Sequence, residues 1–246
     1  LVEAEGDFEA AVDILRKKGQ KVAAKRADRD ATEGAVIAKT NGADKGAVIK
    51  LSCETDFVAK NEDFVALANK IADIALTSGV ATAEELGAVE FEGGLTVAAK
   101  LQEQTGVIGE KIEVAEMATV SAPYVASYIH MGNKIGTLVG LTAEAAEAGR
   151  DVAMQAAAMN PVALNRDAVP QEVIDRELEV GKDLARQEGK PEAMLDKIAA
   201  GRLNKFFKEN TLVDQDFIKD SKLSVSKYLT SVEAGLAVVD FKRVSL

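Results

Sequence analysis

The sequence contains a single cysteine, Cys53, and a single histidine, His130. One cysteine excludes an intramolecular disulfide, and such scarcity fits a reducing compartment. One cysteine and one histidine are also too few for an ordinary structural zinc site, which takes four such ligands. No stretch approaches the ~20 apolar residues that a bilayer-spanning helix requires. We therefore expect no disulfide, no metal site and no contact with a membrane.

Motifs that bind nucleotide cofactors are missing as well. No glycine-rich segment matches a phosphate-binding loop or a dinucleotide fingerprint. Cys53 and His130 are the only candidates for a thiol–imidazole pair. Cys53 shares one side of a predicted strand with Ile49 and Leu51, which favours a buried, inert thiol. The sequence therefore predicts no catalytic residues, no cofactor and no enzyme activity, and loss of activity on alkylation of Cys53 would reverse that view.

The charge balance is acidic, with 40 Asp and Glu against 30 Lys and Arg and a formal net charge of -10. Such a chain repels nucleic acid on average, because nonspecific affinity for DNA or RNA rests on neutralising phosphates. One basic run departs from this trend, and we interpret it as a solvated helix end and linker, with RNA association as the alternative. The run comprises Arg16, Lys17, Lys18, Lys21, Lys25, Arg26 and Arg29.

The chain opens with Leu1 and not Met, so we expect the true N-terminus to lie upstream. Asp7 is expected to cap a short helix that ends at Gly19, a favoured residue after a helix. This helix has no partner nearby in sequence, so we interpret residues 1–19 as the remnant of an N-terminal helical domain. Residues 20–33 are polar and basic and are expected to form a linker. The helix would carry Phe8, Ala11, Val12 and Leu15 on one side.

A β-hairpin followed by a helix is predicted twice along the chain. In the first copy, the strands 35–39 and 47–53 flank a turn with the pair Asn-Gly, whose residues tolerate positive φ. A helix with apolar residues at helical spacing comes next, and a further strand at 112–120 joins the hairpin. We assign residues 34–122 to this first core subdomain.

The second copy repeats this order, with a hairpin at 124–141, a helix that ends at Asn160-Pro161, and a last strand at 236–244. The repetition indicates an internal structural duplication. We assign residues 123–246 to the second core subdomain. The predicted fold class is α+β, with two related small antiparallel-sheet subdomains that are each covered by helices on one face.

A different pattern interrupts the second copy at about 171–208. Two strongly charged helices, 171–187 and 192–208, are joined by a Gly-Lys-Pro turn. A short connection between two helices gives an antiparallel hairpin, and the narrow apolar seam is typical of two helices in a coiled coil. We expect this insertion to project from the core, and self-association through it stays open.

The most unusual segment is 54–61 (Glu-Thr-Asp-Phe-Val-Ala-Lys-Asn), where an apolar strand ends and a helix begins. Thr55 is expected as an N-cap, and Asn61 as the cap of the longer helix beyond. At such a turn Asp56 and Phe57 can point outward together. Alternatively, Phe57 packs beneath the helix as a hydrophobic staple, and spacing alone slightly favours this structural role.

Four segments, in the right order, resemble the elongation factor Ts family. Residues 53–60 (Cys-Glu-Thr-Asp-Phe-Val-Ala-Lys) resemble its signature, and 107–112 (Val-Ile-Gly-Glu-Lys-Ile) its entry into the next strand. Residues 128–136 (Tyr-Ile-His-Met-Gly-Asn-Lys-Ile-Gly) resemble its tyrosine–histidine–glycine hairpin. Residues 151–161 (Asp-Val-Ala-Met-Gln-Ala-Ala-Ala-Met-Asn-Pro) resemble its second-half helix. The helical hairpin and the last strand also fall where the family has them, so the resemblance covers nearly the whole chain.

The resemblance implies a cytoplasmic guanine-nucleotide exchange factor of protein synthesis. Members of this family bind elongation factor Tu in its GDP form and promote GDP release so that GTP can bind. Thr55, Asp56, Phe57 and Val58 match the part that reaches the partner's GTPase domain. Phe57 would wedge into an apolar crevice there, and Asp56 would help disturb the segments that hold Mg²⁺.

By the same resemblance, Ile108, Gly109 and His130 match further positions that touch the partner, and the second half of the chain grips another partner domain. Gln155 stands where relatives commonly have histidine, which argues against essential chemistry at that position. Two other classes stay open. A binding module would dock the GTPase without promoting release, and an RNA-associated protein would use the basic run.

Overall fold

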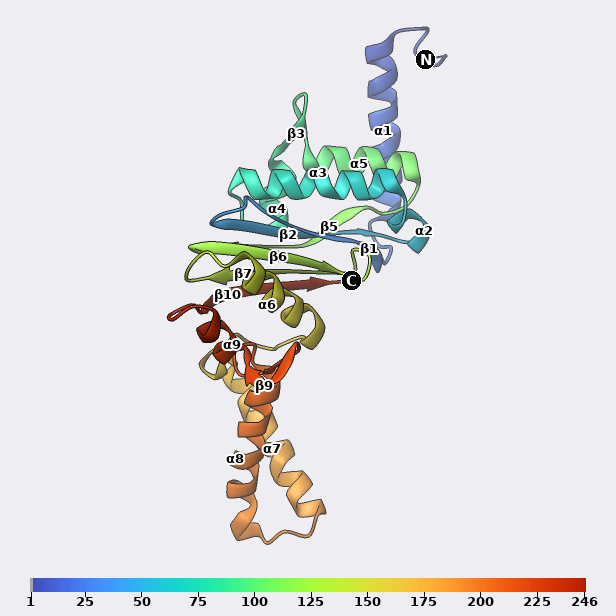
Figure 1. Cartoon of the computed structure of the whole chain (residues 1–246). Coiled ribbons are helices and arrows are strands. Elements are labelled where there is room, and N and C mark those ends of the chain that lie inside the picture. Colours follow the sequence, from blue (N-terminus) through green and yellow to red (C-terminus); the bar gives the residue numbers. More distant parts are fainter. Residues whose placement is uncertain (1) are drawn as a thin grey trace.

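Two three-stranded antiparallel sheets pack face to face, and a helix covers the outer face of each sheet (Figure 1). The computed structural model describes residues 2–246. Leu1, the first residue of the predicted remnant, lies outside the described residues, and so do the side chains of Phe8, Glu9 and Arg16. The expected α+β class, with small antiparallel sheets flanked by helices, is confirmed.

The first sheet contains β1 (Glu33–Thr40), β2 (Lys45–Cys53) and β5 (Glu113–Ser121), in the order β1-β2-β5. Helix α3 (Glu62–Ser78) lies on its outer face, and Asn61 caps it by accepting from two backbone N–H groups, as predicted. The strands are rich in β-branched and other apolar residues, which favour pleated, half-buried surfaces. Their outward side chains pack against the apolar side of α3 and form one core. Its largest members include Ile37, Ile49, Leu51, Phe64 and Ile71.

The second sheet contains β6 (Tyr124–His130), β7 (Ile135–Leu141) and β10 (Val238–Ser245), in the order β10-β7-β6. Helix α6 (Ala146–Met159) covers its outer face and ends at Asn160, whose backbone is left-handed. In both sheets a hairpin and a helix precede a strand that pairs with the second hairpin strand. This shared order confirms the two related sheet subdomains, while their boundaries at 34–122 and 123–246 stay predictions.

The inner faces of the two sheets cover each other. Gly136 in β7 permits this close approach, since a Cβ atom there would lie 2.8 Å from Val36 and 3.0 Å from Val48 in the opposite sheet. The backbone N–H of Val36 also donates to the carbonyl of Asn133 across the interface at 2.7 Å. The apolar layer between the sheets consists of Val36, Ala38, Val48, Val120, Val125, Leu138 and Val244.

Helix α1 (Phe8–Arg26) is longer than predicted. Asp7 caps it as expected, because its carboxylate accepts from the N–H of Ala10 at 3.0 Å. The predicted end at Gly19 is wrong, and the helix continues through residues that were expected to form a linker. Gly19 instead lies where α1 crosses α5, and a Cβ atom on Gly106 of α5 would be 2.5 Å from its Cα.

Three short elements and helix α5 (Val97–Ile108) connect α3 to β5. They are α4 (Ala83–Ala88), β3 (Glu90–Glu92) and β4 (Leu95–Thr96). Leu86 of α4 and Val97 of α5 are buried in the first core. This connection therefore leads the chain from the end of α3 to β5, which forms the edge of the first sheet beside β2.

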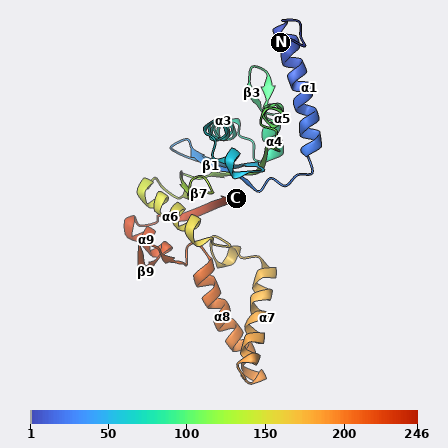
Figure 2. The same cartoon turned by 90° about the vertical axis from the view of Figure 1, so that its right-hand side faces the viewer.

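The predicted helical hairpin is confirmed by α7 (Gln171–Gln187) and α8 (Leu195–Asn210), which project away from the sheets (Figure 2). A 3₁₀ turn, Glu192–Met194, precedes α8, so the second helix begins slightly later than expected. Several short elements near the end of the chain and before α7 anchor the hairpin beside α6. They are the 3₁₀ turn Arg166–Ala168, β8 (Asp216–Phe217), β9 (Asp220–Ser224) and α9 (Val225–Val232).

Replacing Gly136 with Ala should separate the two sheets locally, because the rigid side chains of Val36 and Val48 occupy the space that the new methyl group needs. We expect the free energy of unfolding to fall by about 1–3 kcal/mol, measured by urea denaturation.

The matched control is Gly201→Ala in α8, where an added Cβ meets no atom within 4 Å. That change should raise stability by about 0.5–1 kcal/mol, since alanine favours a helix interior over glycine. A Gly136→Ala protein as stable as the unchanged chain would contradict the close packing of the sheets.

Candidate functional site

Residues 55–58, here called the tip, leave the end of β2 and form most of the single-turn helix α2 (Asp56–Ala59). Thr55 is the N-cap, as predicted, and its hydroxyl accepts from the N–H of Val58 at 3.5 Å. Val58 packs against the first core from one side of the turn. The tip is therefore fixed to the sheet through Val58, and the side chains of Asp56 and Phe57 are left to face outward.

Phe57 is 83% exposed, although it is one of the most apolar side chains in the sequence. The alternative in which Phe57 packs beneath the helix as a staple is therefore wrong. An exposed aromatic ring on a rigid turn is typical of a residue that anchors a protein interface.

Asp56, the residue before Phe57, forms an ion pair with Lys60 at 2.6 Å. The hydrogen bond from Lys60, and then its charge, hold the pKa of Asp56 below its usual value. The pair is exposed to solvent, and ion pairs of this kind contribute little to stability. Asp56 can therefore leave Lys60 for another partner at small cost.

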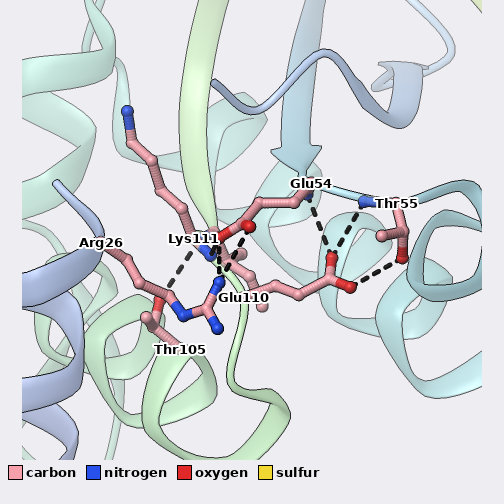
Figure 3. Close-up of polar contacts among 7 residues, drawn as sticks. Arg26, Glu54, Thr55, Thr105, Glu110 and Lys111 are labelled. Atoms are coloured by element: carbon pink, nitrogen blue, oxygen red, sulfur yellow. Dashed lines mark hydrogen bonds and ion pairs between the residues drawn. The ribbon is translucent and has the colours of Figure 1, made fainter. Parts of the chain in front are cut away.

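Glu110 braces the tip from the neighbouring turn between α5 and β5 (Figure 3). One of its carboxylate oxygens accepts from the N–H of Glu54 at 3.1 Å and of Thr55 at 3.0 Å. The other accepts from the hydroxyl of Thr55 at 2.7 Å. A single carboxylate thus takes three donors from the residues that start α2.

Glu54 reaches in the opposite direction, as Figure 3 shows. Its carboxylate accepts from the N–H of Lys111 at 2.7 Å and from the guanidinium of Arg26 at 2.8 Å. The Lys111 N–H first, and Arg26 second, hold the pKa of Glu54 below its usual value. The two turns therefore hold each other, and Arg26 ties α1 to them.

Of the predicted contact residues, Ile108 and Gly109 lie directly before this brace. Ile108 ends α5 and packs against the first core, half-buried. Gly109 has a φ of 79°, a left-handed backbone that ends the helix and redirects the chain toward Glu110. The structure therefore brings these two predicted residues next to the tip.

His130 lies on the other sheet, at the end of β6. Its Nδ1 atom is 3.0 Å from the hydroxyl of Tyr128, and the turn that follows places Met131 in solvent. That turn contacts β1, because the N–H of Val36 donates to the carbonyl of Asn133. Val36 is three residues along β1 from Glu33, which pairs with Cys53 at the end of β2, where the tip begins. His130 is thus at the same end of the two sheets as the tip, but in a separate element.

Cys53 and His130 do not form the thiol–imidazole pair that the sequence left open. They lie on different sheets, and the thiol of Cys53 is fully buried with the carbonyl of Thr55 at 3.2 Å. Burial raises the pKa of Cys53 to about 12. Within residues 2–246, no group of three or more His, Cys, Asp and Glu is placed to hold a metal ion. In the same range, no helix has the length and apolar character needed to cross a membrane.

Gln155 of α6 is fully buried, and its side chain is hydrogen-bonded within the protein. Its side-chain carbonyl accepts from the N–H of Ile218 at 2.8 Å, and its amide donates to the carbonyl of Asp216 at 3.2 Å. These bonds attach the β8–β9 hairpin to the second core.

Sequence reasoning did not find the roles of Arg26, Glu54 and Glu110. Two of them fall inside the segments that carry the family resemblance, but their charges gave no sign of mutual contact. The missing information was the left-handed turn at Gly109, because only that turn brings Glu110 back to the start of α2.

The sequence is similar to those of known proteins along nearly its whole length. The family model described as "Elongation factor TS" matches residues 54–246. Elongation factor Ts of Christiangramia forsetii is 58% identical over 250 residues, covering 100% of this chain and 90% of that protein. The one of Flavobacterium psychrophilum is 54% identical with the same coverage, and that of Amoebophilus asiaticus is 52% identical over 99% of this chain and 90% of its own length. The chain belongs to the elongation factor Ts family, which serves translation elongation.

The thiol of Cys53 should resist alkylation in the folded protein. Because its pKa is raised to about 12, the reactive thiolate stays rare as the pH rises from 7 to about 9. We expect slow labelling by a maleimide in buffer and rapid labelling in urea, followed by mass spectrometry. Since Cys53 is the only cysteine, every label reports on it. Fast labelling without urea would contradict the buried position beneath the tip.

Proposed function

We propose that this protein is a guanine-nucleotide exchange factor that binds elongation factor Tu in its GDP form and promotes GDP release. The observation that supports this most is the tip, because it presents a solvent-exposed aromatic ring on a braced turn. An exposed Phe57 that follows a solvent-accessible acidic side chain suits a wedge that enters an apolar crevice of another protein. Membership of the elongation factor Ts family supports the choice of elongation factor Tu as the proposed partner.

The proposed action needs no active site in this chain. Mg²⁺ bridges and neutralises the phosphates of a nucleotide bound to a GTPase. Phe57 and Asp56 would displace the partner segments that hold this ion, which leaves the phosphate charges poorly screened and weakens GDP binding. The exchange factor and the nucleotide then weaken each other's binding to the GTPase to the same extent, as linkage requires. The factor speeds exchange and leaves the equilibrium between GDP and GTP unchanged.

Further contacts would extend this interface along one end of the molecule. Ile108 and Gly109 would touch the partner beside the tip, and His130 would touch it from the second sheet. The second subdomain would bind another domain of the partner, so the two proteins would meet at two places. Self-association through the helical hairpin, the absence of direct nucleic-acid binding and a cytoplasmic location are parts of the same proposal.

Phe57→Ala should slow stimulated GDP release without unfolding the protein, because its ring makes few contacts within the chain. Truncating an aromatic anchor typically costs about 2 kcal/mol, so we expect a roughly 30-fold loss in stimulation. The measurement is stopped-flow release of fluorescent GDP from elongation factor Tu, with circular dichroism to verify folding.

The matched control is Thr77→Ala, which truncates an exposed side chain near the C-terminal end of α3, at the other end of that helix from the tip. It should stimulate release at the native rate. A Phe57→Ala protein that stimulates as well as the control would refute the wedge. A native chain that binds the GTPase and leaves the rate of GDP release unchanged would instead identify a binding module.

A further inference from the structure

We infer that Glu110 is a positioning residue for the tip, which fixes the direction of Phe57 without touching the partner's nucleotide site. This inference rests on the proposed exchange function and deepens it. It assigns to the turn between α5 and β5 a task that is separate from partner contact.

Helix α2 has only four residues, Asp56–Ala59, and cannot hold its own shape. An isolated single turn is unstable, because fixing its first residues costs more conformational entropy than one hydrogen bond returns. The start of such a helix also leaves backbone N–H groups without partners inside the helix. External contacts must therefore define where α2 begins and which way its side chains point.

Glu110 supplies these contacts at the start of the turn. It binds the N–H groups of Glu54 and Thr55, which fixes the backbone immediately before α2. It also accepts a hydrogen bond from the hydroxyl of Thr55 at 2.7 Å. The lone pairs of the Thr55 hydroxyl oxygen are then available to accept from the N–H of Val58. One carboxylate thus orients both the N-cap and the chain that leads into Phe57.

A carboxylate is the side-chain group that best matches the donors at this position. All three neighbours of Glu110 donate, and a carboxylate has two oxygens that only accept. The amide of glutamine has a single accepting oxygen, so its N–H group must face either the two backbone donors or the hydroxyl of Thr55, which would then have to reverse its hydrogen bond and accept. Glu110→Gln therefore changes the hydrogen bonding while it preserves the size of the side chain.

The brace is closed from the other side. Glu54 accepts from the N–H of Lys111, the residue after Glu110, so each turn binds the backbone of the other. The side chains of Glu54 and Arg26 are only 16% and 33% exposed, and their ion pair balances the charge that two neighbouring carboxylates bring together. The tip is thereby preorganised before it meets a partner, which lowers the entropy lost on binding.

The test is a double-mutant cycle of Glu110→Gln and Phe57→Ala, read as stimulated GDP release from elongation factor Tu. Glu110→Gln alone should lower the maximal stimulated rate about tenfold, because a displaced anchor loses its fit. In a chain that already carries Phe57→Ala, the same change should cost less than about twofold, since the residue through which it acts is gone.

The matched control is Glu116→Gln, which removes one carboxylate from β5, the strand that follows Glu110 in the chain. Glu116 is 48% exposed and its ion pair with Lys50 is long, at 3.7 Å, so the native rate is expected. Urea denaturation of each variant separates a loss of folded protein from a loss of positioning. Amide hydrogen exchange at Thr55 and Val58 should rise in Glu110→Gln and stay unchanged in the control.

Three results would overturn the inference. A native rate in Glu110→Gln beside a slow Phe57→Ala would refute the positioning role and leave the exchange function standing. Full additivity in the double variant would show that Glu110 acts independently of Phe57. A native chain that does not accelerate GDP release at all would refute the proposed function, and the role in exchange with it.

Discussion

Face-to-face packing of the two sheets is the constraint on which the rest of this structure depends. Each sheet has only three strands, and each is apolar on both faces. The outer faces take one helix each, and the inner faces must cover each other to leave water. Gly136 permits the approach by having no side chain, and backbone hydrogen bonds from Val36 to Asn133 and from Val125 to Ala43 join the two sheet subdomains. This packing brings the tip and the turn after His130 to the same end of the molecule.

At that end, a very short helix carries the residue that matters most for the proposed function. The entropic cost of ordering the single turn of α2 is met by hydrogen bonds from outside it, chiefly those of Glu110. Val58 anchors one side in the core, so Phe57 must face solvent. A ring held outward is costly for an isolated chain, and it becomes favourable once a partner covers it.

Much of this fold could be predicted from the sequence, because local signals were unambiguous. Thr55 and Asn61 are cap residues at a strand-to-helix junction, and both cap as expected. Hydrophobic spacing also located both hairpins and their helices. The contact between the sheets was not predicted, although the inner and outer faces of β1 are both buried over residues 34–38. A continuous apolar run of this kind is compatible with burial on both sides but does not identify the second cover.

Two features of the structure, one of the fold and one of the site, lay beyond sequence reasoning for different reasons. Gly19 carries the signal of a helix end, yet tertiary packing against Gly106 uses the same lack of a side chain for a helix crossing. Local sequence does not distinguish these uses. Glu54 and Glu110 are 56 residues apart, and nothing local links two acidic residues that meet only because the backbone turns at Gly109. The family resemblance reversed the preference for a buried Phe57, and its exposure agrees with that reversal.

In the function that we propose, the tip acts on the metal site of a partner GTPase. The most direct measurement compares stimulated GDP release from elongation factor Tu in excess Mg²⁺ and after chelation of Mg²⁺. If the tip weakens GDP binding by displacing the ion, the native chain should accelerate release strongly with Mg²⁺ present and much less once the ion has been removed. An equal acceleration under both conditions would contradict the account.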